Sequence, residues 1–164
     1  MTNKRDGEIA LPFDPAAESG PTVAFIGKIR SPWSPGNAPG NVKGARARLA
    51  EEGGACFIEL DPRYADGLLG LEPGRQIIVL YWMDQGRRDL IVQTPRHTDG
   101  PRGVFSLRSP VRPNPIAMST VEITSVDGTR IGIDAIDCFD GTPVVDIKPW
   151  IATVDQPVAQ QPKG

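Results

Sequence analysis

The sequence predicts a mainly β protein, a small β-barrel with short helical turns and Pro/Gly-rich loops. Its 164 residues contain 17 prolines and 18 glycines spread over the whole length, which disfavours long helices. Between them lie short apolar runs of strand length, and an Asp-Gly pair at residues 127–128 joins two such runs as a tight hairpin would. The chain is long enough to bury one sizeable core and shows no internal repeat, so a single domain is expected.

Two strands and two helical segments are expected in the first half of the chain. The strands cover residues 22–29 and 56–60. A short helix is expected over residues 42–52, which contain Ala, Arg and Leu. Residues 61–69 are expected to form a helical turn, because Asp61 can cap it and a proline follows at the first helical position.

Five strands are expected in the second half. Residues 76–83 form a nearly continuous apolar run, so this strand is expected to be buried on both faces, with residues 90–93 as its antiparallel neighbour. The hairpin pairs residues 119–125 with residues 130–136. A last short strand is expected over residues 144–147.

The chain divides into one folded domain and two tails. Residues 1–20 are charged and carry few apolar side chains, which predicts a flexible N-terminal tail without the apolar centre of a signal peptide. Residues 152–164 are polar and contain prolines, so a C-terminal tail or arm is expected. The barrel domain is therefore expected over residues 21–151.

Composition argues against several classes of protein. No run of about 18 apolar residues occurs, so no membrane span is expected. Cys56 and Cys138 form no close pair and give no metal pattern, which suits buried free thiols in a reducing cytoplasm. The formal net charge of −2 argues against bulk nucleic-acid binding. No glycine-rich loop opens a helix after a strand, so neither a Rossmann site nor a P-loop is expected.

The most distinctive segment is a proline-rich stretch at residues 108–119. Three prolines in six residues favour an extended backbone, so the loop holds Arg108, Arg112 and Asn114 in set directions. Four arginines and a single acid lie between Arg96 and Arg112, a local positive patch suited to an anionic ligand. A plain structural turn with a solvated charged face would have the same composition, and both interpretations stay open.

Three motifs in fixed order carry a resemblance to a known family. They are IGKIRSP at residues 26–32, GVFSLRSPVRPNPI at residues 103–116 and DCFDGTPVVDIKPW at residues 137–150. Together they resemble the TsaA-like family, also called YaeB/TrmO, over about residues 23–151. The resemblance implies a non-Rossmann β-barrel methyltransferase that uses S-adenosyl-L-methionine and methylates N6 of threonylcarbamoyladenosine at position 37 of tRNA. It also implies a homodimer with the cofactor near the subunit interface.

The resemblance places the cofactor-binding candidates on three segments. Asp84 and Gln85 occupy the position of a family pair that contacts the cofactor, and a plain hairpin turn fits them equally well. Asp137 or Asp140 could accept a hydrogen bond from the cofactor's ribose or amino group, or could open an Asx turn instead. The remaining cofactor-binding candidates are Arg108, Gly141 and Thr142.

Two arginines and an asparagine are candidates for binding the substrate or the cofactor's carboxylate. Arg108 and Arg112 could each clamp a carboxylate or a phosphate, and we expect one to face ligand while the other holds the loop. Arg112 and Asn114 are the substrate-binding candidates, although Asn114 is equally suited to orient the loop.

A carboxylate is the expected catalytic group. Methyl transfer to a carbamoyl-substituted N6 is helped by removal of its proton, and Asp137 and Asp140 are the candidates to accept that proton directly or through a water. His97 is the only histidine and an alternative base, although a single histidine on an arginine-rich loop is more often a surface residue.

Four features depart from the family pattern. Residues 35–41 lack a Pro-Arg-Gln element, Asp84 replaces the histidine of a His-Gln pair, and Ala117 stands where glycine is usual. The C-terminal extension of longer bacterial members is also missing. Three alternatives to tRNA methylation therefore stay open: a module that only binds S-adenosyl-L-methionine, a methyltransferase of small molecules, and an RNA-binding barrel without cofactor.

Overall fold

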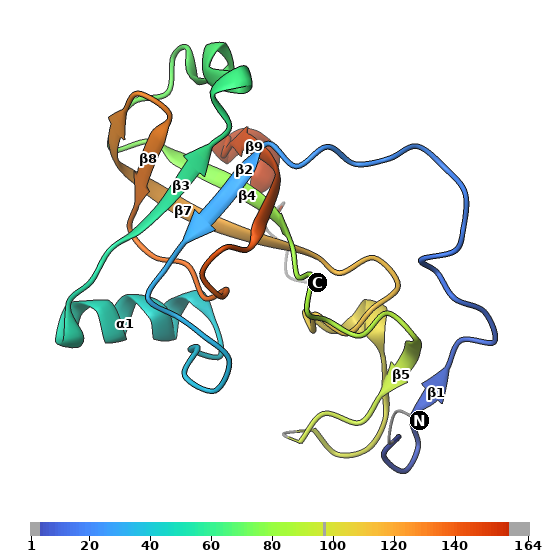
Figure 1. Ribbon diagram of the computed structural model, residues 1–164. Helices are drawn as coiled ribbons and strands as arrows, with labels where there is room; N and C mark the ends of the chain where they lie inside the picture. Colours follow the sequence, from blue (N-terminus) through green and yellow to red (C-terminus); the bar gives the residue numbers. More distant parts are fainter. Residues whose placement is uncertain (1–3, 97, 158–164) are drawn as a thin grey trace, which may run out of the picture.

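The computed structural model describes residues 4–96 and 98–157 and contains a closed six-stranded antiparallel barrel (Figure 1). In order around the barrel, the strands are β2 (Gly27–Arg30), β3 (Cys56–Leu60), β8 (Arg130–Ile133), β7 (Ile116–Asp127), β4 (Gln76–Trp82) and β9 (Pro143–Pro149), which pairs with β2 again. The predicted β-barrel is thereby confirmed.

The barrel interior follows from the alternation of side chains along each strand. On β4, Ile77, Val79 and Tyr81 point inward and are buried, whereas Ile78 and Leu80 point outward and are only partly covered. The prediction that both faces of this strand are buried is therefore wrong for the outer face. A closed barrel is a single layer, and its outer face is covered only where another segment lies over it.

The β7–β8 hairpin confirms the turn that the sequence predicts. Asp127 lies opposite Arg130, so the loop consists of Gly128 and Thr129 alone. Gly128 has a φ of 57°, the left-handed conformation that a first loop position in such tight hairpins requires. Strand β7 begins at Ile116, three residues before the predicted start.

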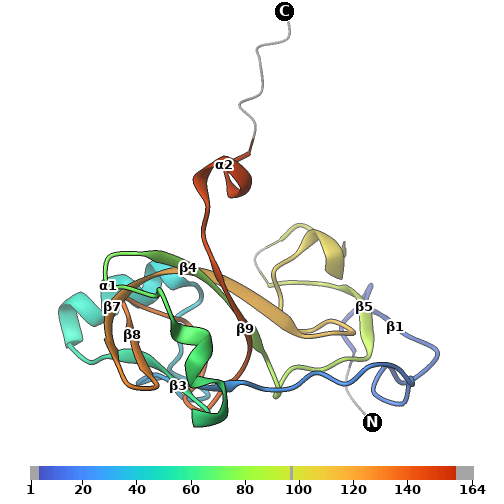
Figure 2. The same ribbon diagram turned by 90° about the horizontal axis from the view of Figure 1, so that it is seen from above.

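A second, three-stranded sheet lies beside the barrel, formed by β1 (Ile9–Ala10), β5 (Leu90–Gln93) and β6 (Arg102–Gly103) (Figures 1 and 2). Two sequence predictions are corrected here. Strand β5 is not the neighbour of β4, because both edges of β4 are already paired with β7 and β9. Part of the expected tail over residues 1–20 is a strand, since β1 pairs with β5 and Glu8 accepts a hydrogen bond from the Thr94 backbone.

Helix α1 (Val42–Glu52) has the bounds that the sequence predicts, and it packs against one end of the barrel (Figure 1). Asn41 caps it by accepting a hydrogen bond from the Gly44 backbone at 2.8 Å. Its Ala45 packs against Trp33, whose indole N–H donates to the Ile136 carbonyl at 2.6 Å. The contact fixes α1 close to the loop that follows β8.

Three shorter helical segments complete the fold: η1 (Pro62–Leu68), η2 (Val104–Ser106) and α2 (Ala152–Asp155). Asp61 caps η1 as predicted. Helix α2 falls in the predicted tail or arm and projects from the end of β9 in Figure 2. Among the described residues, none of the helices is long and apolar enough to cross a membrane.

Two further expectations concern the first strand and the thiols. The strand predicted over residues 22–29 is reduced to β2 and runs one residue further, to Arg30. Cys56 and Cys138 are free and buried, as expected.

Candidate functional site

A cleft of about 970 Å³ opens on the barrel between the start of α1, strand β7 and the proline-rich loop. Residues 38–43, residues 107–110 with Arg112, and residues 116–120 of β7 line it. Leu107, Met118 and Phe139 contribute apolar surface. The volume is that of a site for a small molecule or cofactor.

The cleft contains a hydrogen-bonded group of three side chains around one carboxylate. The Tyr81 hydroxyl donates to Asp137 Oδ1 at 3.0 Å and lies 3.0 Å from Ser119 Oγ. All three residues line the cleft. Burial, reinforced by the Asp137 carboxylate, raises the pKa of Tyr81 well above its usual value. Tyr81 therefore stays protonated and keeps Asp137 oriented as an acceptor.

Cationic side chains from two parts of the chain line the cleft. Arg108 and Arg112 come from the proline-rich loop, and Lys43 and Arg46 come from α1. Arg46 is ion-paired with Asp134 and donates to the Thr120 carbonyl, so it connects α1 to the barrel. Arg108 and Lys43 form no ion pair with any described residue, which leaves them as the cations suited to an anionic group.

Arg112 holds the proline-rich loop together. Its guanidinium donates to the carbonyls of Val104, Leu107 and Ser109 at 3.1, 3.1 and 3.3 Å. Arg112 thus holds the loop, as expected of one of the two arginines, and contact of the other with ligand stays a prediction. These hydrogen bonds give Arg112 a structural position at the edge of the cleft, although it was a substrate-binding candidate.

The turn after β4 forms hydrogen bonds with the proline-rich loop. Arg88 donates to the Pro113 carbonyl at 2.6 Å and to Asn114 Oδ1 at 3.4 Å, so Asn114 orients the loop and lies outside the cleft lining. The backbone of this turn is in close contact with the backbone of the proline-rich loop. A Cβ atom added to Gly86 would therefore lie 2.7 Å from the Pro110 carbonyl oxygen.

Asp84 and Gln85 lie on this turn, exposed and outside the cleft lining. The Gly86 N–H donates to the Met83 carbonyl and closes the turn. Asp84 and Gln85, two of the cofactor-binding candidates, therefore lie in a turn, as one of the two interpretations of the sequence expected.

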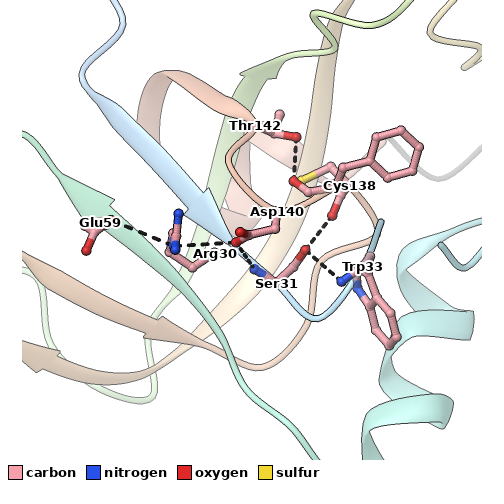
Figure 3. Close-up of polar contacts among 8 residues, drawn as sticks. Arg30, Ser31, Trp33, Glu59, Cys138, Asp140 and Thr142 are labelled. Atoms are coloured by element: carbon pink, nitrogen blue, oxygen red, sulfur yellow. Dashed lines mark hydrogen bonds and ion pairs between the residues drawn. The ribbon is translucent and has the colours of Figure 1, made fainter. Parts of the chain in front are cut away.

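Asp140, Gly141 and Thr142 also lie outside the cleft lining and hold the loop before β9 (Figure 3). Asp140 accepts from the Ser31 backbone at 3.2 Å and faces Arg30 at 3.5 Å. The buried Thr142 donates to the Phe139 carbonyl, and Gly141 takes a φ of 82° at the bend. Asp140 thus connects β2 to this loop, and the contacts of the three residues with cofactor or substrate stay predictions.

The sequence missed several cleft residues. None of Tyr81, Phe139, Ser119 and Lys43 is among the site candidates from the sequence, and Tyr81 is both a core residue and a cleft residue. The alternation along β4 and β7 places Tyr81 and Ser119 inside the barrel, but their proximity to Asp137 depends on barrel closure. His97 lies outside the described residues.

Neither metal nor thiol chemistry is indicated in the described part of the chain. No group of His, Cys, Asp or Glu side chains suited to a metal ion is found there. Burial raises the pKa of both Cys56 and Cys138, so neither thiol is a ready nucleophile. The polar side chains of the cleft include the Asp137 carboxylate, the hydroxyls of Tyr81 and Ser119, and the surrounding cations.

The fold and the cleft together define a small antiparallel barrel with a cofactor-sized site, built without the parallel sheet of Rossmann enzymes. The model of the tRNA-methyltransferase O N-terminal domain matches residues 31–156. The chain belongs to this family, which comprises S-adenosyl-L-methionine-dependent methyltransferases.

Individual relatives agree with this assignment. An "S-adenosyl-L-methionine-binding protein" of Archaeoglobus fulgidus is 42% identical over 141 residues, which cover 84% of this chain and 96% of the relative. The "Probable S-adenosyl-L-methionine-binding protein VirR" of Rhizobium radiobacter is 37% identical over 149 residues, covering 90% and 80%. The crystal structure of TrmO from Pseudomonas aeruginosa superposes with a TM-score of 0.63 at 30% identity.

That superposition covers 89% of this chain and 62% of the Pseudomonas aeruginosa chain. The chain thus spans less than two thirds of that protein's length. The predicted family and fold are confirmed, and the predicted methyltransferase class and cofactor are confirmed at the level of the family.

Proposed function

We propose that the protein binds S-adenosyl-L-methionine in the cleft and methylates N6 of threonylcarbamoyladenosine in tRNA. The observation that carries the proposal is the oriented Asp137 carboxylate within a cofactor-sized cleft of a TrmO-family barrel. A cytoplasmic location belongs to the same proposal and is supported by the free thiols of Cys56 and Cys138.

The residues of the cleft match the chemistry of the cofactor. Leu107, Met118 and Phe139 suit its adenine, and Arg108 with Lys43 suits its carboxylate. When bound, S-adenosyl-L-methionine supplies an electrophilic methyl group on a positively charged sulfur. The side chains present therefore fit an apolar base, an anionic end and a cationic centre.

Asp137 is the proposed proton acceptor. The cofactor, held by Arg108, Lys43 and the apolar side chains of the cleft, would supply the methyl group for the substrate nitrogen and would leave as a neutral thioether. The proton of N6 passes to the Asp137 carboxylate, directly or through a water. Tyr81, itself hydrogen-bonded to Ser119, keeps that carboxylate in place, and the cleft walls hold the two reactants in line.

A homodimer is part of the proposal. The outer face of β7 presents Ile116 and Met118, which are 40% and 45% exposed, next to the outward-facing Leu80 of β4. Ile116 and Met118 also line the cleft, so a second copy seated on this face would take part in the cofactor site. Sedimentation of the protein and of its Met118→Glu variant tests this arrangement, with dissociation of a dimer expected for the variant.

Two measurements test the function. Titration calorimetry with S-adenosyl-L-methionine should show binding, and labelled methyl groups should enter tRNA that carries threonylcarbamoyladenosine but not tRNA that lacks it. Binding without transfer to any tRNA would favour the alternatives of a binding module or a small-molecule methyltransferase. The Archaeoglobus fulgidus relative, almost wholly covered by this chain, is named only as a binding protein, and this name supports the alternative of cofactor binding without transfer to tRNA.

A further inference from the structure

Phe105 is displayed to solvent beside the cleft on a short helical segment. Its side chain is 79% exposed, although it sits in η2 between the buried Val104 and the cleft residue Leu107. A single exposed apolar residue is common on proteins, so exposure alone is not informative. What distinguishes Phe105 is the way its backbone is held and the charges around it.

The backbone around Phe105 is fixed from both sides. Arg112 donates to the carbonyls of Val104 and Leu107, and the Ser106 hydroxyl donates to the Gly103 carbonyl at 2.7 Å. The completely buried Val104 secures the segment against the neighbouring β5. The aromatic ring is thus presented with little loss of backbone entropy on binding.

Two arginines flank the ring, three residues before and three residues after it. Arg102 and Arg108 are exposed, and neither forms an ion pair with any of the described residues. Arg102 instead donates to the carbonyls of Asp99 and Pro101, which direct its guanidinium without neutralising it. Phe105, Arg102 and Arg108 form what we call the Phe105 surface.

Other exposed apolar side chains lack this combination. Leu69 is 95% exposed but is aliphatic, and Val154 is 74% exposed but stands next to Asp155. An exposed aromatic ring with an unpaired arginine three residues before it and another three residues after it in the sequence is complementary to a base and its neighbouring phosphates, because every base has a face that stacks and every phosphate is anionic. Charge therefore favours RNA over a second protein as the partner of this surface.

We propose that the Phe105 surface binds single-stranded RNA beside the cleft, with Phe105 stacked on an unpaired base and the arginines on adjacent phosphates. The inference rests on the proposed function, since it assigns the contact with the nucleotides that flank the methylated adenosine. Arg108 lies at the boundary and lines the cleft as well. Bases of an RNA loop are already unpaired, so one can stack on the ring at little cost.

The test uses an RNA hairpin whose loop carries 2-aminopurine next to the target adenosine, because the fluorescence of that base reports stacking. Phe105→Ala should weaken hairpin binding by about 5- to 150-fold and abolish the fluorescence change. Phe105→Tyr should restore both. Leu69→Ala is the matched control, since it removes a more exposed apolar side chain elsewhere.

The arginines are tested by salt dependence. Arg102→Ala should lower the slope of log affinity against log salt by about one, as expected for a lost phosphate contact. Arg75→Ala removes an exposed arginine outside this surface and should leave the slope unchanged.

The outcomes separate this inference from the proposed function. If the unaltered protein methylates tRNA while Phe105→Ala binds the hairpin equally well, the inference is overturned and the function stands. If the unaltered protein binds cofactor but neither binds nor methylates RNA, the proposed function fails first. A Phe105→Ala variant that dissociates a dimer would assign the surface to a second copy and overturn the inference.

Discussion

Asp137 and Asp140 lie three residues apart on one loop, and the structure gives them opposite surroundings. Asp137 faces the cleft and accepts from the Tyr81 hydroxyl, whereas Asp140 faces β2 and accepts from the Ser31 backbone (Figure 3). The same division separates Arg108, which is unpaired in the described structure, from Arg112, which donates to three carbonyls. Each motif thus supplies one residue that lines the cleft and one whose hydrogen bonds hold the fold.

Activity should separate the two aspartates most strongly. Asp137→Asn keeps the shape and the hydrogen bond from Tyr81 but cannot take a proton, so turnover of tRNA methylation should fall about 100-fold or more. Cofactor affinity, measured by calorimetry, should change far less. Asp140→Asn should leave turnover close to that of the unaltered enzyme. Equal losses in both variants would contradict the division.

Stability should separate the two arginines. Arg112→Ala removes a charged donor from three carbonyls and should lower the free energy of unfolding by about 1–3 kcal/mol, measured in urea. Arg108→Ala should change it by less than about 0.5 kcal/mol while weakening cofactor binding. Arg112→Lys should not rescue stability, since an ammonium group cannot reach three carbonyls as the fork does.

Tyr81, the hydrogen-bond partner of Asp137, should resist ionisation in alkaline solution because it is buried. The folded pKa of Tyr81 is raised above the unfolded value of about 10, so its contribution to stability is present below that pH and is lost as the pH rises above it. In a Tyr64→Phe variant, Tyr81 is the only tyrosine left. Its ultraviolet absorbance should stay that of the neutral phenol until the protein unfolds, and ionisation of the folded protein near pH 10 would argue against this buried group.

The ion pair of Asp140 should contribute the smallest effect. Asp140 and Arg30 are 46% and 41% exposed and 3.5 Å apart, so Asp140→Asn should cost no more than about 1 kcal/mol. Added salt should shrink the difference between the variant and the unaltered protein, because exposed pairs are screened. A large loss that is insensitive to salt would contradict an exposed, screened ion pair.

The sequence allowed the local parts of the fold to be predicted and left the long-range parts undetermined. Helix α1, the cap at Asp61 and the β7–β8 hairpin each depend on neighbouring residues. The partner of β5 depends instead on which strands occupy both edges of β4, and one of them, β9, lies far along the chain. Pairing between strands that are far apart in the sequence produces no local sequence pattern from which it could be predicted.

The same limit applies to the cleft. Asp137 and Arg108 were candidates because their motifs are distinctive. Tyr81 was missed because its hydroxyl meets a residue 56 positions away, inside a barrel that only closure creates. The cofactor-binding assignments of Asp84 and Gln85 came from the position of a family pair, and here those residues occupy the outside of a turn.

Gly86 limits which amino-acid substitutions this turn can accept. No other amino acid has room there, because a Cβ atom would meet the backbone oxygens of Pro110 and Met83 at 2.7 and 3.0 Å, and backbone cannot swing aside as a flexible side chain can. Asp84 and Gln85, exposed beside it, are free to change. Random mutagenesis of this turn should therefore yield active variants at two positions and almost none at the third, although none of the three touches the cleft.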